Sequence, residues 1–248
     1  MQEASISEIL EFRCLGTFAF SSCDGWREGP SRTRGRALLQ YLVSHARSAI
    51  PRSALIEALW PDCELADCAH RLHLAVSGAR LALRDEKHRL NPIVHRDDSY
   101  GWHSSIRVVA DTDRFVSCYN TRTMESMAEG VEIYAGPFLA GEPGDWLLPL
   151  RTRYEHMYVT MLERLALTAA QCDDYAGATG YALRAVAVDP AHEGAVRIAM
   201  LCLAKSGRRA AALAEYENLN RYLKRWLGVG PMPDTTALHD SIRSGQLP

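Results

Sequence analysis

Residues 66–85, ADCAHRLHLAVSGARLALRD, decide the fold of the first half of the chain together with residues 93–103, IVHRDDSYGWH. In the first segment, apolar residues recur every three or four positions, at Leu72, Val76, Ala79 and Leu83. This spacing predicts a helix that buries one face against a core. Leu74 and Leu81 are expected to widen the apolar stripe. The opposite face is expected to carry Arg71, Ser77, Arg80 and Arg84.

The second segment is typical of a β-hairpin. Ile93 and Val94 predict a strand, Asp97-Asp98-Ser99 a turn, and Tyr100 to His103 the returning strand. A basic-faced helix beside a hairpin is the arrangement that a winged helix presents to DNA. The sequence therefore predicts a DNA-binding element between residues 66 and 103.

The charge of the chain supports this element only locally. The net charge is −2, which does not favour nucleic acid for the molecule as a whole. Between residues 66 and 96, however, six lysines and arginines stand against three carboxylates, before the hairpin turn adds two more acids. A second basic cluster comprises Arg32, Arg34 and Arg36. Patches of this size are sufficient for phosphate contacts.

Length and composition indicate a globular protein of one or two domains. The chain has 248 residues, of which 47% are hydrophobic and 23% charged, so it can bury substantial cores. No run approaches the roughly 18 apolar residues of a membrane span, and the N-terminal MQEASISEIL lacks the features of a signal peptide. Seven cysteines at irregular spacings fit a reducing compartment. We therefore expect a cytoplasmic protein without membrane contact.

The remaining elements of the first half complete a small α+β domain. Residues 9–20 suggest strands around Gly16, and 23–25 a turn before a return strand at Trp26. A helix is expected from Thr33 to His45. Pro51 opens a second helix, which ends before Pro61 and is expected to pack four residues inward: Leu55, Ile56, Leu59 and Trp60. We expect one domain over residues 1–105.

Beyond Ile106 the sequence predicts helix after helix. Asp111 or Thr112 can cap a helix that reaches toward Glu129. A Gly/Pro-rich loop over 136–144 then precedes a long helix over 146–171. The segments YAGA at 175–178 and RAAA at 209–212 lie 34 residues apart, the period of tetratricopeptide helix pairs. The fold class is therefore mainly α, an α+β winged helix-turn-helix domain followed by an all-α tetratricopeptide-like domain over 106–248.

Taken together, these segments resemble a known family. The order LGTFAF, RTRGRALLQYLV, PRSALIEALWPD, HRLHLAVSGARLAL and IVHRDDSYGW is similar to the OmpR-type winged helix. DWLLPLRTRYEHMYVTMLERLA and the tail LGVGPMPDTTALHDSI resemble the bacterial transcriptional activator domain. The whole chain thus resembles the Streptomyces antibiotic regulatory protein (SARP) family of transcription activators. This resemblance implies binding to repeated sites near a promoter, recruitment of RNA polymerase and activation of a gene set.

The resemblance also implies which residues contact double-stranded DNA. The third helix of the winged domain would enter the major groove, so that Arg71, His73 and Leu74 face base edges. Arg34 and Arg80 would hold phosphates, and Arg96 would act from the hairpin. Arginine suits either role because its fork of donors can bind two acceptors on guanine or on phosphate. The expected contact set is Arg34, Arg71, His73, Leu74, Ser77, Arg80 and Arg96.

Three departures from the family pattern bear on DNA recognition. Gly78 stands where a base-reading arginine is usual, and His70 where asparagine or arginine is frequent. Asp97 and Asp98 replace a glycine-rich turn, and two carboxylates there would repel a phosphate backbone. These positions support an alternative function, a protein-interaction adaptor whose winged helix no longer binds DNA on its own. For either function, a homodimer formed through the helical domain is one expected assembly.

The sequence gives little support to a metal centre or a catalytic site. Cys63, Cys68, His70 and His73 lie close in sequence and invite a zinc site. In a helix, however, Cys68 and His70 point about 200° apart, and the chain has no C-x-x-C pair. Common hydrolase and phosphate-loop motifs are also missing from the sequence. We therefore expect no metal, no cofactor and no enzyme activity.

Overall fold

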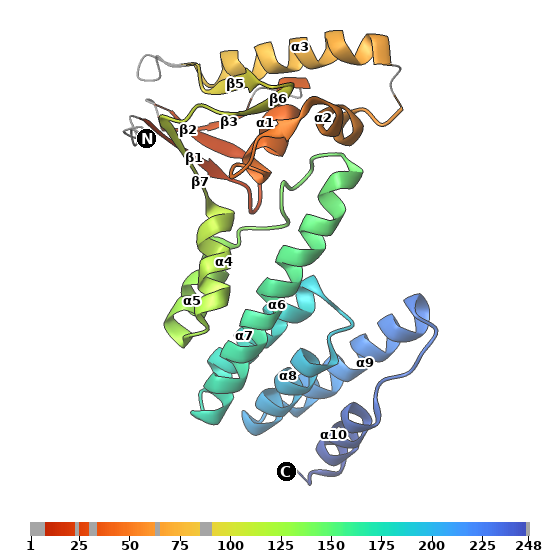
Figure 1. Ribbon diagram of the computed structural model, residues 1–248. Helices are drawn as coiled ribbons and strands as arrows, with labels where there is room; N and C mark the ends of the chain where they lie inside the picture. The colour runs from red at the N-terminus through yellow and green to blue at the C-terminus, as the bar shows by residue number, and fades with distance from the viewer. Residues whose placement is uncertain (1–7, 23–24, 30–33, 63–64, 85–90, 247–248) are drawn as a thin grey trace. The chain divides into compact units, whose positions relative to one another are not determined.

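The computed structural model describes residues 8–22, 25–29, 34–62, 65–84 and 91–246. The chain divides into two compact units. The first comprises Met1–Phe115 with Ile133–Thr152, and the second comprises Val116–Glu132 with Arg153–Pro248. Both small sheets lie in the first unit, and the secondary structure described in the second unit is helical (Figure 1). The predicted fold class, mainly α with an N-terminal α+β winged helix, is confirmed.

A four-stranded sheet opens the first unit. It is built from β1 (Glu8–Arg13), β2 (Ala19–Ser22), β3 (Gly25–Glu28) and β7 (Ile106–Ala110) in the order β3-β2-β1-β7. The β1–β7 pair is parallel, and the other pairs are antiparallel. The strands expected within 9–20 are confirmed, whereas the turn at Cys23 and Asp24 lies outside the described residues. Residues 106–110 form a strand, so the helical character expected from Ile106 begins at Asp111.

Three helices and a second sheet complete the winged fold. The helices are α1 (Arg34–Ser44), α2 (Arg52–Leu59) and α3 (Leu65–Ala82). The sheet has the order β4-β6-β5, with β4 (Ile50–Pro51), β6 (Ser99–Trp102) and β5 (Ile93–Arg96). Figure 1 shows α3 beside the β5–β6 hairpin. In α2 only Leu55 is fully buried. Ile56, Leu59 and Trp60 are also predicted to pack inward, but the structure leaves them only half-buried.

The Gly/Pro-rich segment between α5 (Met124–Ile133) and α6 (Leu148–Gln171) packs on the first unit. Its Leu139 amide donates to the Cys14 carbonyl at 2.7 Å, and Phe138 forms a β-bridge with Leu15. Glu142 accepts a hydrogen bond at 2.7 Å from Arg36 Nε on α1, in an ion pair that is largely shielded from solvent. The segment that sequence reasoning predicts as a connecting loop is therefore an ordered part of the first unit.

Asp111 joins the end of β1 to the start of α4 (Asp111–Thr121). Its carboxylate accepts hydrogen bonds from the Cys14 amide at 2.8 Å and from the Leu15 amide at 3.0 Å. Burial raises the pKa of this carboxyl, while the bonds from Leu15 and Cys14 oppose the shift. Asp111 thus does more than cap its own helix, since it fixes two backbone donors that are distant in sequence.

The second unit begins with two helices where one was predicted. The helix expected between 111 and 129 ends at Thr121, and α5 starts at Met124. Between them Arg122 has a left-handed φ of 61°. Thr123 then caps the new helix, because its hydroxyl accepts from the Ser126 amide while Ser126 Oγ accepts from the Thr123 amide. This reciprocal cap resembles a capping box and explains the break.

The remaining helices of the second unit form antiparallel neighbours. After α6 come α7 (Tyr175–Val188), α8 (Glu193–Lys205), α9 (Arg209–Trp226) and α10 (Pro233–Ser244) (Figure 1). Helices α7 and α9 begin at Tyr175 and Arg209, the two positions that the 34-residue echo predicts. Fully buried alanines allow α7 and α8 to pack closely, namely Ala178, Ala182 and Ala199. The tetratricopeptide-like organisation is confirmed.

Candidate nucleic-acid interface

Helix α3 has one face buried and one face open to solvent. The stripe predicted to enter the core is fully buried at Leu72, Val76, Ala79 and Leu83. The opposite stripe is exposed at His70, His73, Leu74, Ser77 and Leu81. Their spacing of three or four residues places these side chains along one side of the helix. The helix therefore offers a continuous outward surface beside the β5–β6 hairpin.

The composition of the outward surface differs from the prediction. Leu74 and Leu81 do not widen the buried stripe, because 46% and 71% of their surface is exposed. Arg71 and Arg80, expected on the open face, are half-buried, while Arg84 is exposed just beyond the end of the helix. The outward surface is thus largely neutral, with apolar, hydroxyl and imidazole groups in place of a row of cations.

Arg80 connects α3 to the hairpin. Its Nε and Nη2 both donate to the Ile93 carbonyl, at 3.0 and 2.7 Å. Ile93 begins β5 and is fully buried, so this guanidinium holds the hairpin strand against the helix. The structure gives Arg80 a positioning role, and a phosphate contact by its remaining donors stays a prediction.

Gly78 faces helix α1. A Cβ added to Gly78 would lie 3.7 Å from the Gly35 Cα, within the α1–α3 contact. This distance is an ordinary contact, so the close approach of the two helix backbones requires glycine at Gly35 and not at Gly78. Gly78 is partly exposed and lies one turn from Leu74 on the helix. The interpretation that Gly78 removes a base-reading side chain stays a prediction.

The hairpin turn is a tight two-residue turn. Asp97 and Asp98 have φ values of 48° and 53°, and Arg96 pairs directly with Ser99 across the turn. Two successive left-handed residues are typical of a type I′ turn, in which aspartate is well tolerated. Ser99 therefore belongs to β6 and not to the turn. Both carboxylates and Arg96 are exposed, and His95 Nε2 lies 3.9 Å from Asp98 Oδ1.

Two further contacts that the sequence did not predict fix the hairpin. The Arg52 amide at the start of α2 donates to the Asp98 carbonyl at 2.9 Å. Trp102 Nε1 donates to the Leu42 carbonyl of α1 at 3.2 Å. The sequence predicts Trp102 only as part of the returning strand, and no local signal marks either pairing, because the partners are distant in sequence. Together with the bonds from Arg80, these two contacts attach the hairpin to all three helices.

The basic cluster at the start of α1 does not act as one patch. The guanidinium of Arg36 is occupied by Glu142 and by the Gly29 carbonyl. Arg34 is the first residue of α1, and a phosphate contact by its side chain stays a prediction. Arg32 lies outside the described residues.

The residues considered for zinc do not converge. Cys68 is fully buried in α3, whereas His70 and His73 are exposed on its other side. Cys63 lies outside the described residues. Within the described ranges, no three histidine, cysteine or acidic side chains are grouped so that they could hold a metal ion. In the same part of the chain, no helix combines the length and apolar character needed to cross a bilayer.

Comparisons with known proteins agree with this architecture. Regulatory protein AfsR of Streptomyces coelicolor is 27% identical over 255 residues, which cover 97% of this chain and 25% of AfsR. Transcriptional regulatory protein MoaR1 of Mycobacterium tuberculosis is 26% identical over 253 residues, which cover 96% of this chain and 81% of MoaR1. The chain thus spans about a quarter of the length of AfsR.

A solved structure has the same fold. It is described as Mycobacterium tuberculosis EmbR in complex with low affinity phosphopeptide. The match has a TM-score of 0.71 at 20% identity and covers 96% of this chain and 65% of that chain.

The strongest assignment comes from the helical half of the chain. The family model described as the bacterial transcriptional activator domain matches residues 111–243, which is more than half of the chain. The two relatives that match nearly the full length of this chain are named as regulatory proteins. The prediction of a SARP-family protein is confirmed, and the chain belongs to the bacterial transcriptional activator domain family.

Proposed function

We propose that the chain is a sequence-specific DNA-binding transcription activator that reads the major groove with α3. The observation that carries the proposal is the exposed stripe of α3, which lies beside the β5–β6 hairpin and opposite a fully buried stripe. A helix held in this way presents side chains to a groove without disturbing its own core. Cytoplasmic residence, where the chromosome is located, is part of this proposal.

Each predicted contact residue has a role that its environment supports. His73 and Ser77 are exposed hydrogen-bonding side chains, suited to base edges. Leu74 is apolar and exposed, and apolar side chains contact the methyl group of thymine. The exposed Arg96 and the helix-start Arg34 suit phosphates. Arg71 is half-buried, so its guanidinium would reach a base from the side of the helix.

The helical repeats would supply the protein contacts of an activator. Repeats of this kind create extended surfaces that bind other proteins. We include in the proposal that the second unit engages RNA polymerase and mediates a homodimer at promoter-proximal repeats.

A protein-interaction adaptor that does not bind DNA alone is the second candidate. It is favoured by the two exposed leucines on α3 and by the exposed carboxylates of Asp97 and Asp98. Such a surface attracts phosphate weakly and offers apolar contacts to a protein. The two candidates differ in one measurable respect, the response of DNA affinity to salt.

The deciding experiment is fluorescence anisotropy of the whole chain with a labelled duplex from the region upstream of its own gene. For an activator we expect affinity that falls as salt rises, because phosphate contacts release counterions, and tighter binding than to a shuffled duplex. Arg71→Ala should reduce the preference for the native duplex, whereas Arg96→Gln should weaken both duplexes alike.

Two controls complete the design. Leu81→Ser alters the outward surface of α3, and Leu167→Ser alters an exposed leucine of α6. Only the first should reduce affinity for the native duplex. Absence of binding to the native duplex at low salt would favour the adaptor, and equal losses from Arg71→Ala on both duplexes would contradict the division of roles.

A further inference from the structure

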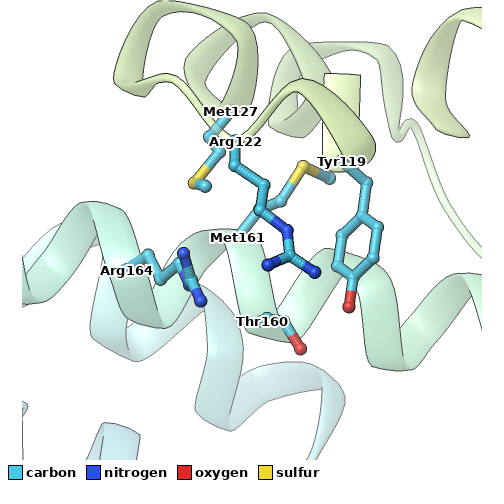
Figure 2. A pocket seen from close by; sticks show the side chains of 6 residues that line it. All are labelled: Tyr119, Arg122, Met127, Thr160, Met161 and Arg164. Carbon is cyan, nitrogen blue, oxygen red and sulfur yellow. The ribbon is translucent and has the colours of Figure 1, made fainter. Parts of the chain in front are cut away.

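A small pocket opens in the second unit between the α4–α5 turn and α6. It is lined by Tyr119, Arg122, Met127, Thr160, Met161 and Arg164, which surround about 240 Å³ of space that is partly open to solvent. Figure 2 shows the guanidinium groups of Arg122 and Arg164 directed into the same space, beside the hydroxyl of Thr160. No residue of the first unit, which includes α3, lines this pocket. The pocket is therefore separate from the proposed DNA interface.

The charge of this pocket is not compensated within the described residues. Arg122 and Arg164 are both exposed, and neither has an ion pair or hydrogen bond from its guanidinium in that part of the chain. Arg184 of the same unit contrasts with them, because it bonds Glu132 and the hydroxyl of Tyr158. Two like charges that share a pocket repel each other. An oxyanion placed between them would remove this repulsion and accept several hydrogen bonds.

The backbone keeps one of the two arginines at the rim of the pocket. Arg122 lies between α4 and α5 with φ 61°, and the reciprocal bonds of Thr123 and Ser126 fix the start of α5 directly after it. Arg164 and Thr160 are one turn apart on α6. Thr160 Oγ1 donates to the His156 carbonyl at 2.8 Å, so the guanidinium groups and the Tyr119 hydroxyl are the donors left for a ligand.

The accessible donors of the pocket decide which ligand it can bind. Met127 and Met161 also line the pocket, but both are fully buried and leave almost no surface for a ligand. A carboxylate matches the accessible donors, since its two oxygens can accept hydrogen bonds from both guanidinium groups.

We propose that this pocket binds one acidic side chain, glutamate or aspartate, of a protein partner. The two guanidinium groups bind the carboxylate. This inference does not depend on DNA binding by α3, because every lining residue belongs to the second unit. It gives the helical unit a defined point of attachment for an acidic segment.

The test is an NMR titration that follows the arginine side-chain Nε–H signals of the whole chain at constant ionic strength. The probe is glutamate capped at both backbone ends, and capped glutamine serves as its neutral isostere. Inorganic phosphate is the third probe, because it offers an oxyanion that is not part of an amino-acid side chain. Capped glutamate should shift the signals of Arg122 and Arg164 saturably, and capped glutamine should not.

Variants then assign the binding to the pocket. Arg164→Gln and Arg122→Gln should each weaken the binding of capped glutamate by about tenfold, the loss expected for one charge-assisted hydrogen bond. Arg221→Gln removes an exposed arginine from α9 and should leave the affinity within about twofold. Circular dichroism establishes that each variant is folded. If a variant does not fold, the titration of the unaltered chain with capped glutamate and capped glutamine still decides the proposal.

Three results would overturn the proposal. Equal shifts from capped glutamine would show that charge is not recognised, and equal shifts at Arg221 would show only general screening. Tighter binding of phosphate than of capped glutamate would assign the pocket to a free anion and not to an acidic side chain.

Discussion

Gly35 of α1 and Gly78 of α3 face each other where these two helices cross. A Cβ on Gly35 would lie 2.7 Å from the Ala79 nitrogen and 2.9 Å from the Gly78 carbonyl carbon, whereas a Cβ on Gly78 would lie 3.7 Å from the Gly35 Cα. The first distance is shorter than any normal contact, and the last is an ordinary one. The crossing therefore has no room for a methyl group on Gly35 but has room for one on Gly78.

Gly35→Ala should destabilise the protein. Its methyl group would meet backbone atoms of α3 that cannot rotate away, so the helices must separate, at a cost of about 1–3 kcal/mol. Urea denaturation gives the change in the free energy of unfolding. Because α3 carries the outward surface, DNA affinity measured by anisotropy should fall as well.

Gly78→Ala should have the opposite sign. The added methyl group fits, and alanine favours a helix interior over glycine by about 1 kcal/mol. We expect a gain of about 0.5–1 kcal/mol in the same denaturation experiment. A loss in Gly78→Ala as large as that in Gly35→Ala would contradict the asymmetry of the crossing.

Glu142→Gln should destabilise the first unit by about 1.5–3 kcal/mol, because it removes a shielded charge-assisted bond to Arg36. Asp113→Asn is the matched control. It breaks the Arg47–Asp113 pair, whose side chains are 89% and 48% exposed, and exposed pairs contribute about 0–1 kcal/mol. Thermal unfolding of the two variants should differ clearly, and equal small shifts would show that the Glu142 bond contributes little.

Arg80→Met should loosen the hairpin while it retains the packing of the side-chain stem. The change removes both donors to the Ile93 carbonyl, and an unpaired buried acceptor costs about 1–3 kcal/mol. Hydrogen exchange of the β5 and β6 amides should accelerate. Arg84→Met, at the exposed end of the same segment, should leave these amides protected, so faster exchange in both variants would argue against a specific role of Arg80.

Asp111 should make stability depend on acidic pH. Burial raises its pKa in the folded protein above the ordinary value of 3.8. The folded state therefore binds the proton more readily, and the free energy of unfolding should fall as pH rises from about 4 to the raised pKa and then level off. Denaturation series for the natural chain and Asp111→Asn isolate this contribution. The free energy of unfolding of the natural chain minus that of Asp111→Asn should decline over that pH interval. An increase of this difference with pH would contradict the assignment.

Local pattern predicted much of the fold. The buried stripe of α3, the tight hairpin turn and the starts of α7 and α9 follow from helical period, turn chemistry and repeat length. The exposure of Leu74 and Leu81 could not be predicted in the same way. Apolar residues occupy two sides of α3, and only the position of α1, which packs against Ala75 and Ala79, decides which side is buried.

Long-range contacts account for the other differences. Arg36 and Glu142 are 106 residues apart. No local pattern around either residue therefore indicates that residues 133–152 belong to the first unit. The division into domains at residue 105 stays a prediction. The break between α4 and α5 had a partial signal in Thr123 and Ser126, but nothing in composition marks Arg122 for a left-handed conformation.

Leu74 and Leu81 keep apolar surface in contact with water on the free protein. Any partner that covers α3, whether duplex or protein, must remove that surface from water. Removal of apolar surface gives association a negative heat-capacity change, whatever the charge of the partner. Calorimetry at several temperatures would therefore report directly whether α3 is covered in a complex.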